Sequence, residues 1–125
     1  MRALYKTLRQ GKAVGILPDQ VPPDEESGVF APFFGIPAYT MILVSRLARK
    51  TGAKVIFSYV KRLPQGQGFH VHFFPAPADI AADNLAVACA ALNQGVEHCV
   101  QSCPEQYQWS YKRFKRRPIG MISVY

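Results

Sequence analysis

Long apolar runs are missing from this 125-residue chain, and so are paired cysteines and glycine-rich phosphate loops. No stretch reaches the roughly 18 consecutive apolar residues of a membrane-spanning helix, so no such helix is predicted. The cysteines number three, an odd count that fits a reducing compartment better than a disulfide framework. The "GQG" at 66–68 follows neither the dinucleotide-binding pattern nor the P-loop pattern, which excludes both kinds of nucleotide site.

Acidic residues are also scarce. There are eight of them against fifteen lysines and arginines, which gives a net charge of +7 and a pI near 9.6. An excess of positive charge indicates acidic partners such as nucleic acid, anionic lipid or an acidic protein. Hydrophobic residues make up 49% of the chain, enough to bury a core, so disorder is not expected. The length allows one domain or part of one.

Helices and strands are expected to follow one another in an order typical of α/β proteins. The spacing of apolar residues predicts helices over 2–10, 39–51 and 83–102, and a further helix from Pro104 that carries residues 105–117. Short apolar or β-branched runs predict strands at 13–17, 54–60 and 69–74, the last two forming a hairpin. Residues 18–37 contain five prolines and are expected to form one long loop.

Asp19 and Gln20 come directly after the expected strand 13–17. Ligands of open α/β sheets bind beyond the carboxyl ends of the strands, so this pair is a candidate for ligand binding. The alternative is structural, because an aspartate that follows a proline is common in turns. Spacing alone favours the structural interpretation.

Phe30, Phe33 and Phe34 fall within the expected loop. Loops lie at the surface, so these side chains are candidates for the apolar wall of a hydrophobic substrate site. Ordinary core packing is the alternative.

Histidines and cysteines give a weaker signal. His70 and His72 share one face of an expected strand, which is a candidate zinc pair, but no third ligand is evident. His98 lies close to Cys99 and Cys103 on the expected helix 83–102, yet both cysteines also fit the apolar stripe of that helix. No metal site is therefore predicted.

The C-terminal part of the chain combines positive charge with aromatic residues. Its cations are Lys112, Arg113, Lys115, Arg116 and Arg117, and its aromatic residues are Tyr107, Trp109, Tyr111 and Phe114. A solvated helix face is one interpretation. The others are nucleic-acid binding through phosphates and base stacking, and docking on an anionic membrane. Composition does not separate them.

Four blocks of the sequence together resemble one family. They are "LRQGKAVGILPDQ", "GVFAPFFGIPAYT", "SRLARKTGAKVI" and "PEQYQWSYKRFKRRP", in that order. Their order and spacing resemble the lipid A biosynthesis lauroyl/myristoyl acyltransferases, members of the wider glycerolipid-type acyltransferases. The resemblance implies transfer of a fatty acyl chain from acyl carrier protein to a lipid A precursor, at the cytoplasmic face of the inner membrane, with no cofactor and no nucleic-acid partner.

The resemblance also implies roles for the candidate residues. Asp19 and Gln20 would belong to the active-site block, and Phe30, Phe33 and Phe34 would lie near the acyl-chain groove. The cations Lys112, Arg113, Lys115, Arg116 and Arg117 would face anionic lipid, the phosphates of the sugar substrate or the acidic carrier protein.

One family feature is missing. The family's catalytic motif is a histidine followed five positions later by Asp or Glu, and the histidine acts as general base. The residues five positions after His70, His72 and His98 are Pro75, Pro77 and Cys103. We therefore expect residues 1–125 to be the C-terminal portion of an αβα acyltransferase domain of about 300 residues, whose membrane anchor and base lie upstream.

Two other functions remain as alternatives. One is a small basic nucleic-acid-binding module, in which the aromatic residues around Trp109 would be exposed. The other is an acyl-CoA-dependent relative that acylates lysophospholipids. The sequence preceding Met1 would distinguish all three functions.

Overall fold

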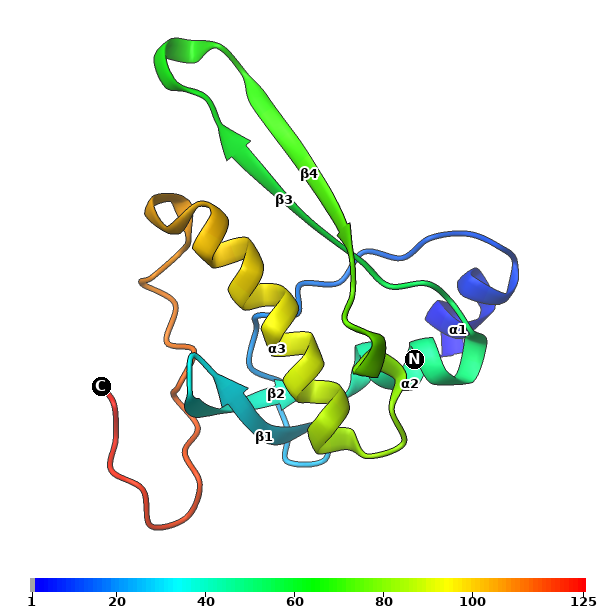
Figure 1. The fold of residues 1–125 in the computed structure, drawn as a ribbon. Helices are drawn as coiled ribbons and strands as arrows, with labels where there is room; N and C mark the ends of the chain where they lie inside the picture. The colour runs from blue at the N-terminus through cyan, green and yellow to red at the C-terminus, as the bar shows by residue number, and fades with distance from the viewer. Residues whose placement is uncertain (1) are drawn as a thin grey trace.

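The computed structural model describes residues 2–125, which form a mixture of helices and strands (Figure 1). The elements are α1 (Arg2–Arg9), β1 (Gly28–Phe33), β2 (Ile36–Met41), α2 (Leu43–Thr51), β3 (Ile56–Arg62), β4 (Phe69–Pro75) and α3 (Leu85–Ser102). Short 3-10 turns occur at Pro64–Gly66, Ala78–Ala81 and Pro104–Gln106. This composition is consistent with the expected α/β class. The strands form two separate antiparallel pairs, β1–β2 and β3–β4.

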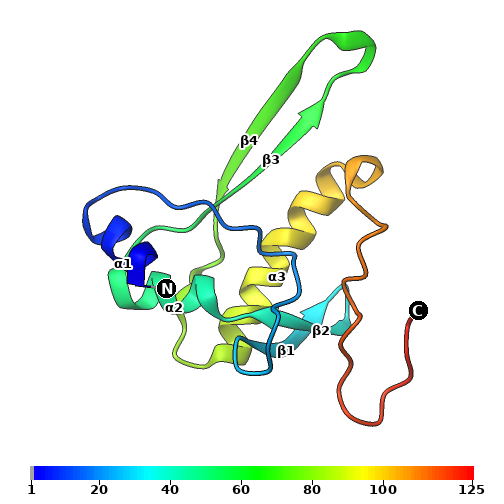
Figure 2. The same ribbon diagram turned by 180° about the vertical axis from the view of Figure 1, so that it is seen from behind.

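The helix α3 organises the core. It begins at Asn84, whose side chain accepts hydrogen bonds from the backbone N–H groups of Ala86 and Val87, and such a cap satisfies donors that have no partner within the helix. The helix packs on β1, β2 and β3, and its buried face includes Leu92 and Val96. Both views place α3 between the ribbon β1–β2 and the base of β3–β4 (Figures 1 and 2).

The ribbon β1–β2 takes up residues 28–37 of the long loop expected over residues 18–37, whereas residues 18–27 contain no helix or strand, as predicted. The two strands are joined by Phe34 and Gly35, whose φ angles are 48° and 76°. Two successive positive φ angles are typical of the type I′ turns that close two-residue hairpins. The Phe34 N–H donates to Oε1 of Glu97 on α3 (2.6 Å), so a contact from a distant part of the chain stabilises an unfavourable backbone conformation. Residues 39–41 belong to β2, so the helix expected over 39–51 begins only at Leu43, as α2.

The hairpin β3–β4 was predicted and is confirmed, with Phe57 opposite Phe74 and Val60 opposite Val71. Phe57 and Phe74 stack and pack on α3 at the base of the hairpin. The rest of the hairpin projects away from the body of the chain (Figure 1). Directly opposed residues share a face, and one face is apolar and exposed: it carries Ile56, Val60, Phe69, Val71 and Phe73.

The strand expected at 13–17 is wrong, because these residues have no regular secondary structure. Strand geometry persists where backbone N–H and C=O groups meet those of a neighbouring strand. No strand of residues 2–125 pairs with this segment.

The helix expected over 105–117 is also wrong. A short 3-10 turn at Pro104–Gln106 is followed by irregular turns. The indole N–H of Trp109 donates to the Pro104 carbonyl (2.8 Å), and the Trp109 backbone N–H donates to the Tyr107 carbonyl (2.9 Å). These two contacts use a carbonyl and an N–H group that a helical ladder would pair in another way. Long-range bonds from arginine side chains, described below, also tie this segment to β2 and to Pro23.

Candidate functional site

A groove of about 770 Å³ lies between the irregular segment 11–19, the two helices α2 and α3, and β3. Its lining is mainly apolar and includes Ile16, Leu47, Leu92, Val96 and Val100. Leu47, Leu92, Val96 and Val100 belong to the buried core, so the floor of the groove is fixed by packing. The groove can hold an apolar chain, because concave sites that are lined by hydrophobic side chains favour apolar ligands.

Asp19 lies at the end of segment 11–19 and lines the groove, as does Tyr107 from the opposite end of the chain. The negative charge of Asp19 acts on its neighbours. Burial raises the pKa of the Tyr107 hydroxyl, and the Asp19 carboxylate raises it further. Burial likewise raises the pKa of the Cys99 thiol, and Asp19 again adds to the effect. The groove thus combines an apolar lining with one carboxylate.

Gln20 is exposed and does not line the groove. The next residues are held by side chains from the C-terminal segment. The Val21 N–H donates to the Tyr111 hydroxyl (2.8 Å), and Arg116 Nη2 donates to the Pro23 carbonyl (2.5 Å). Because Val21 follows Asp19 by only two residues, these bonds restrict the backbone that carries the carboxylate.

Replacing Tyr111 with phenylalanine removes the acceptor of the Val21 N–H. We expect amide hydrogen exchange at Val21 to accelerate roughly fivefold, since one lost hydrogen bond is worth about 1 kcal/mol. Tyr125→Phe is the matched control, because the Tyr125 hydroxyl accepts from the Phe114 N–H (3.1 Å) at another site. Unchanged exchange at Val21 in Tyr111→Phe would show that the bond does not hold this segment.

Arg113 is 3% exposed, so it does not face solvent as the sequence suggested. Its Nη1 donates to the Tyr39 carbonyl (2.8 Å), and its Nη2 donates to Thr40 Oγ1 (3.0 Å) and Asn93 Oδ1 (3.3 Å). Burial lowers the pKa of its guanidinium, and the nearby Tyr107 opposes this shift. Arg113 therefore connects the C-terminal segment to β2 and α3.

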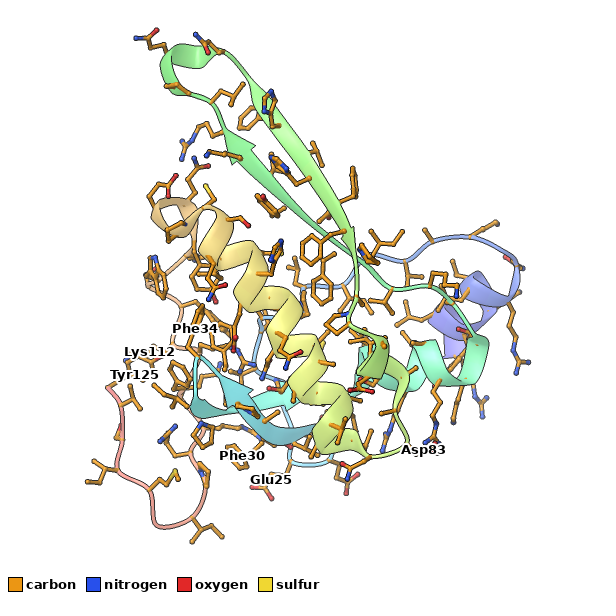
Figure 3. All side chains as sticks on the ribbon, viewed as in Figure 1. Glu25, Phe30, Phe34, Asp83, Lys112 and Tyr125 are labelled. Carbon is orange, nitrogen blue, oxygen red and sulfur yellow. The ribbon has the colours of Figure 1, made fainter. Side chains whose placement is uncertain are left out.

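The other C-terminal cations divide into two groups. Arg116 and Arg117 donate to backbone carbonyls, Arg117 through Nη1 to Pro37 (2.9 Å). Lys112 and Lys115 are exposed and lie over the rings of Tyr125 and Tyr111. Figure 3 shows Lys112 beside Tyr125 near the chain end. The five cations thus do not form one exposed surface.

The three candidate phenylalanines also separate. Phe33 is 2% exposed and packs in the core, whereas Phe30 and Phe34 are 37% and 40% exposed. Figure 3 shows Phe34 at the turn of the ribbon and Phe30 farther along β1. None of the three lines the groove, so their proposed place at an acyl-chain wall finds no support in its geometry.

Sequence reasoning missed Thr40 and Asn93 altogether, and it did not place Tyr107 at the groove. Thr40 and Asn93 are buried polar side chains that accept from Arg113, and Tyr107 lines the groove. The signal that could have revealed this network is Asn93, a polar residue within the apolar stripe of a helix. A buried polar side chain needs hydrogen-bond partners.

Within residues 2–125, no three or more His, Cys, Asp and Glu side chains cluster as metal ligands would. His70 and His72 are exposed on β4, where His72 stacks on Tyr59. None of the described helices has both the length and the apolarity for a bilayer crossing.

Comparisons with known proteins cover the whole chain. The family model described as bacterial lipid A biosynthesis acyltransferase matches residues 1–116. The chain is 33% identical over 126 aligned residues to a lipid A biosynthesis lauroyltransferase of Escherichia coli K12, with 100% of the chain and 41% of the relative covered. It is 31% identical to a lipid A biosynthesis palmitoleoyltransferase of the same strain, of which it covers 40%. A lipid A biosynthesis acyltransferase of Shigella flexneri gives the same identity and coverage. The chain thus spans about 40% of the length of these relatives.

Proposed function

Because the chain belongs to the bacterial lipid A biosynthesis acyltransferase family, we propose that it forms the C-terminal portion of an enzyme that acylates a lipid A precursor. The donor is acyl carrier protein, and the reaction takes place at the cytoplasmic face of the inner membrane. The observation that carries this proposal is the apolar groove of about 770 Å³ with Asp19 in its lining. The groove holds the acyl chain, which excludes water from it.

Acyl transfer needs a base that takes the proton of the acceptor hydroxyl as its oxygen attacks the thioester carbonyl. The carrier thiol then leaves. We place this base outside the present sequence, because no histidine here is followed five positions later by Asp or Glu. The role of Asp19 is to orient a polar group of the substrate or of the catalytic centre at the groove.

Two surfaces of the chain support a larger domain. Residues 13–17 line the groove and have no partner strand among residues 2–125. One face of β3–β4 is apolar and exposed. Exposed apolar surface of this kind marks interaction sites, and we expect the remainder of the domain to cover both surfaces in an αβα arrangement.

The test compares the chain alone with a chimera in which it replaces the matching part of the E. coli lauroyltransferase. Each is incubated with lauroyl-carrier protein and a tetra-acylated lipid A precursor. We expect turnover from the chimera and none from the chain alone. Lauroyl-CoA with a lysophospholipid, assayed in parallel, tests the acyl-CoA alternative.

Two results would contradict the proposal. Turnover by the chain alone would mean that the base lies within residues 1–125. A chimera that is folded, as judged by gel filtration and thermal unfolding, but inactive with the carrier substrate would mean that this chain does not complete the active site.

A further inference from the structure

A second depression, of about 490 Å³, lies where α1 packs beside α2. Its lining consists of Arg2, Tyr5, Lys6, Arg9, Gln10 and Lys50. Four of these six side chains are cations and none is a carboxylate, so the depression carries a local charge of +4 at neutral pH. We call it the basic depression.

The placement of the cations follows from helix geometry. Positions 2, 6 and 9 are separated by four and three residues, so they lie on one face of α1. Lys50 comes from the last turn of α2, and its Nζ lies 5.6 Å from the centroid of the Tyr5 ring. Two different helices thus direct positive charge to one place.

The basic depression has no internal counter-charge. The first acidic residue of the chain is Asp19, and residues 27–78 contain none. The one ion pair found within residues 2–125 joins Arg49 to Asp83 (2.7 Å), and neither residue lines the basic depression. Clustered like charges repel one another, so an anion bound here would relieve that repulsion.

Its polar groups are suited to phosphate. Arginine presents a planar fork of N–H donors, and lysine presents a compact ammonium group, so both bind phosphate oxygens. Tyr5 also lines the depression, and its hydroxyl has no hydrogen-bond partner among the described residues. A metal cation, in contrast, would find only positive charge here.

The basic depression also adjoins the apolar groove. Leu8 of α1 and the following Gly11 and Lys12 line the groove, while Arg9 and Gln10, which lie between them in the sequence, line the basic depression. A ligand that bridges the two needs a phosphate group close to an apolar chain. We propose that the basic depression binds the phosphate group of an acylated lipid. This inference goes beyond acyl transfer, and it is tested without turnover.

The test uses the full 125-residue chain and two charge-matched triple variants. The first variant is Lys6→Gln, Arg9→Gln and Lys50→Gln; the second removes the exposed cations Arg62, Lys112 and Lys115 in the same way. Each variant lowers the net charge from +7 to +4, that is, by three. Sedimentation with vesicles of phosphatidylcholine, alone or mixed with phosphatidylglycerol, measures binding, and thermal unfolding confirms the fold.

The wild-type chain and the second variant should prefer the phosphatidylglycerol vesicles, and the first variant should bind them at least roughly tenfold more weakly. Added inorganic phosphate should release the bound chain more effectively than chloride at equal ionic strength. Equal losses in the two variants would overturn the proposal, because net charge alone would then explain binding. Preference of the wild-type chain for single-stranded DNA, or for an acidic carrier protein, over these vesicles would overturn it as well.

Discussion

Replacing Gly95 with alanine is expected to destabilise the chain by about 2–3 kcal/mol. Gly95 lies on the buried face of α3, and a Cβ added there would overlap the ring of Phe57. That ring is 7% exposed and stacks on Phe74 with the centroids 5.4 Å apart, so it has little space into which it can move. The clash must therefore displace α3 or disrupt the base of the hairpin β3–β4.

The sign of the effect makes this substitution informative. In an exposed helix, Gly→Ala stabilises by about 1 kcal/mol because alanine has the higher helix propensity. Gly15→Ala is the control, since its added Cβ would have no heavy atom within 4 Å. Urea and thermal unfolding of both variants would decide the matter. Unchanged or raised stability in Gly95→Ala would mean that α3 and β3 do not pack as closely as described.

Local signals were sufficient for several elements. The apolar stripe of α3 and the turn residues between β3 and β4 predicted both elements to within a few residues. Gly11 and Gly52 mark the ends of α1 and α2, and both adopt the positive φ that glycine tolerates well. These features depend on residues that are close together in the sequence.

Other elements depend on distant partners. The ribbon β1–β2 places Pro32 opposite Pro37 and turns at Phe34, so its sequence contains prolines typical of loops. What stabilises its turn is Glu97, which follows Phe34 by 63 positions. Arg113 was expected at the surface because charge usually is, and its acceptors come from β2 and α3. Such pairings are not visible in a local pattern.

The groove was only partly predictable. Asp19 was singled out from its position after a short apolar run, and it does line the groove. The apolar wall was assigned to phenylalanines, whereas the lining consists mainly of aliphatic residues from α2, β3 and α3. The reason is that the aliphatic side chains from α2 and α3 also form the core, and a core pattern alone does not reveal that one side of it is open.

Replacing Asp19 with asparagine should lower kcat by about 100-fold or more in the chimera with the E. coli lauroyltransferase, because misplacing a reacting group by about 1 Å is enough for a loss of this size. Asparagine keeps the shape of the side chain and removes its charge. The Asp19 carboxylate forms no hydrogen bond or ion pair within residues 2–125, so the free energy of unfolding should change little.

Turnover of three chimeras tests the central claim, that the groove with Asp19 forms part of an acyltransferase active site. They carry the unchanged chain, Asp19→Asn and Glu25→Gln, a matched removal of an exposed carboxylate six residues farther along the same segment. We predict that only Asp19→Asn lowers kcat, by about 100-fold or more, while the melting temperatures of all three agree. Near-equal kcat values for the three chimeras would contradict the claim, and so would a loss of activity in Asp19→Asn that is matched by unfolding.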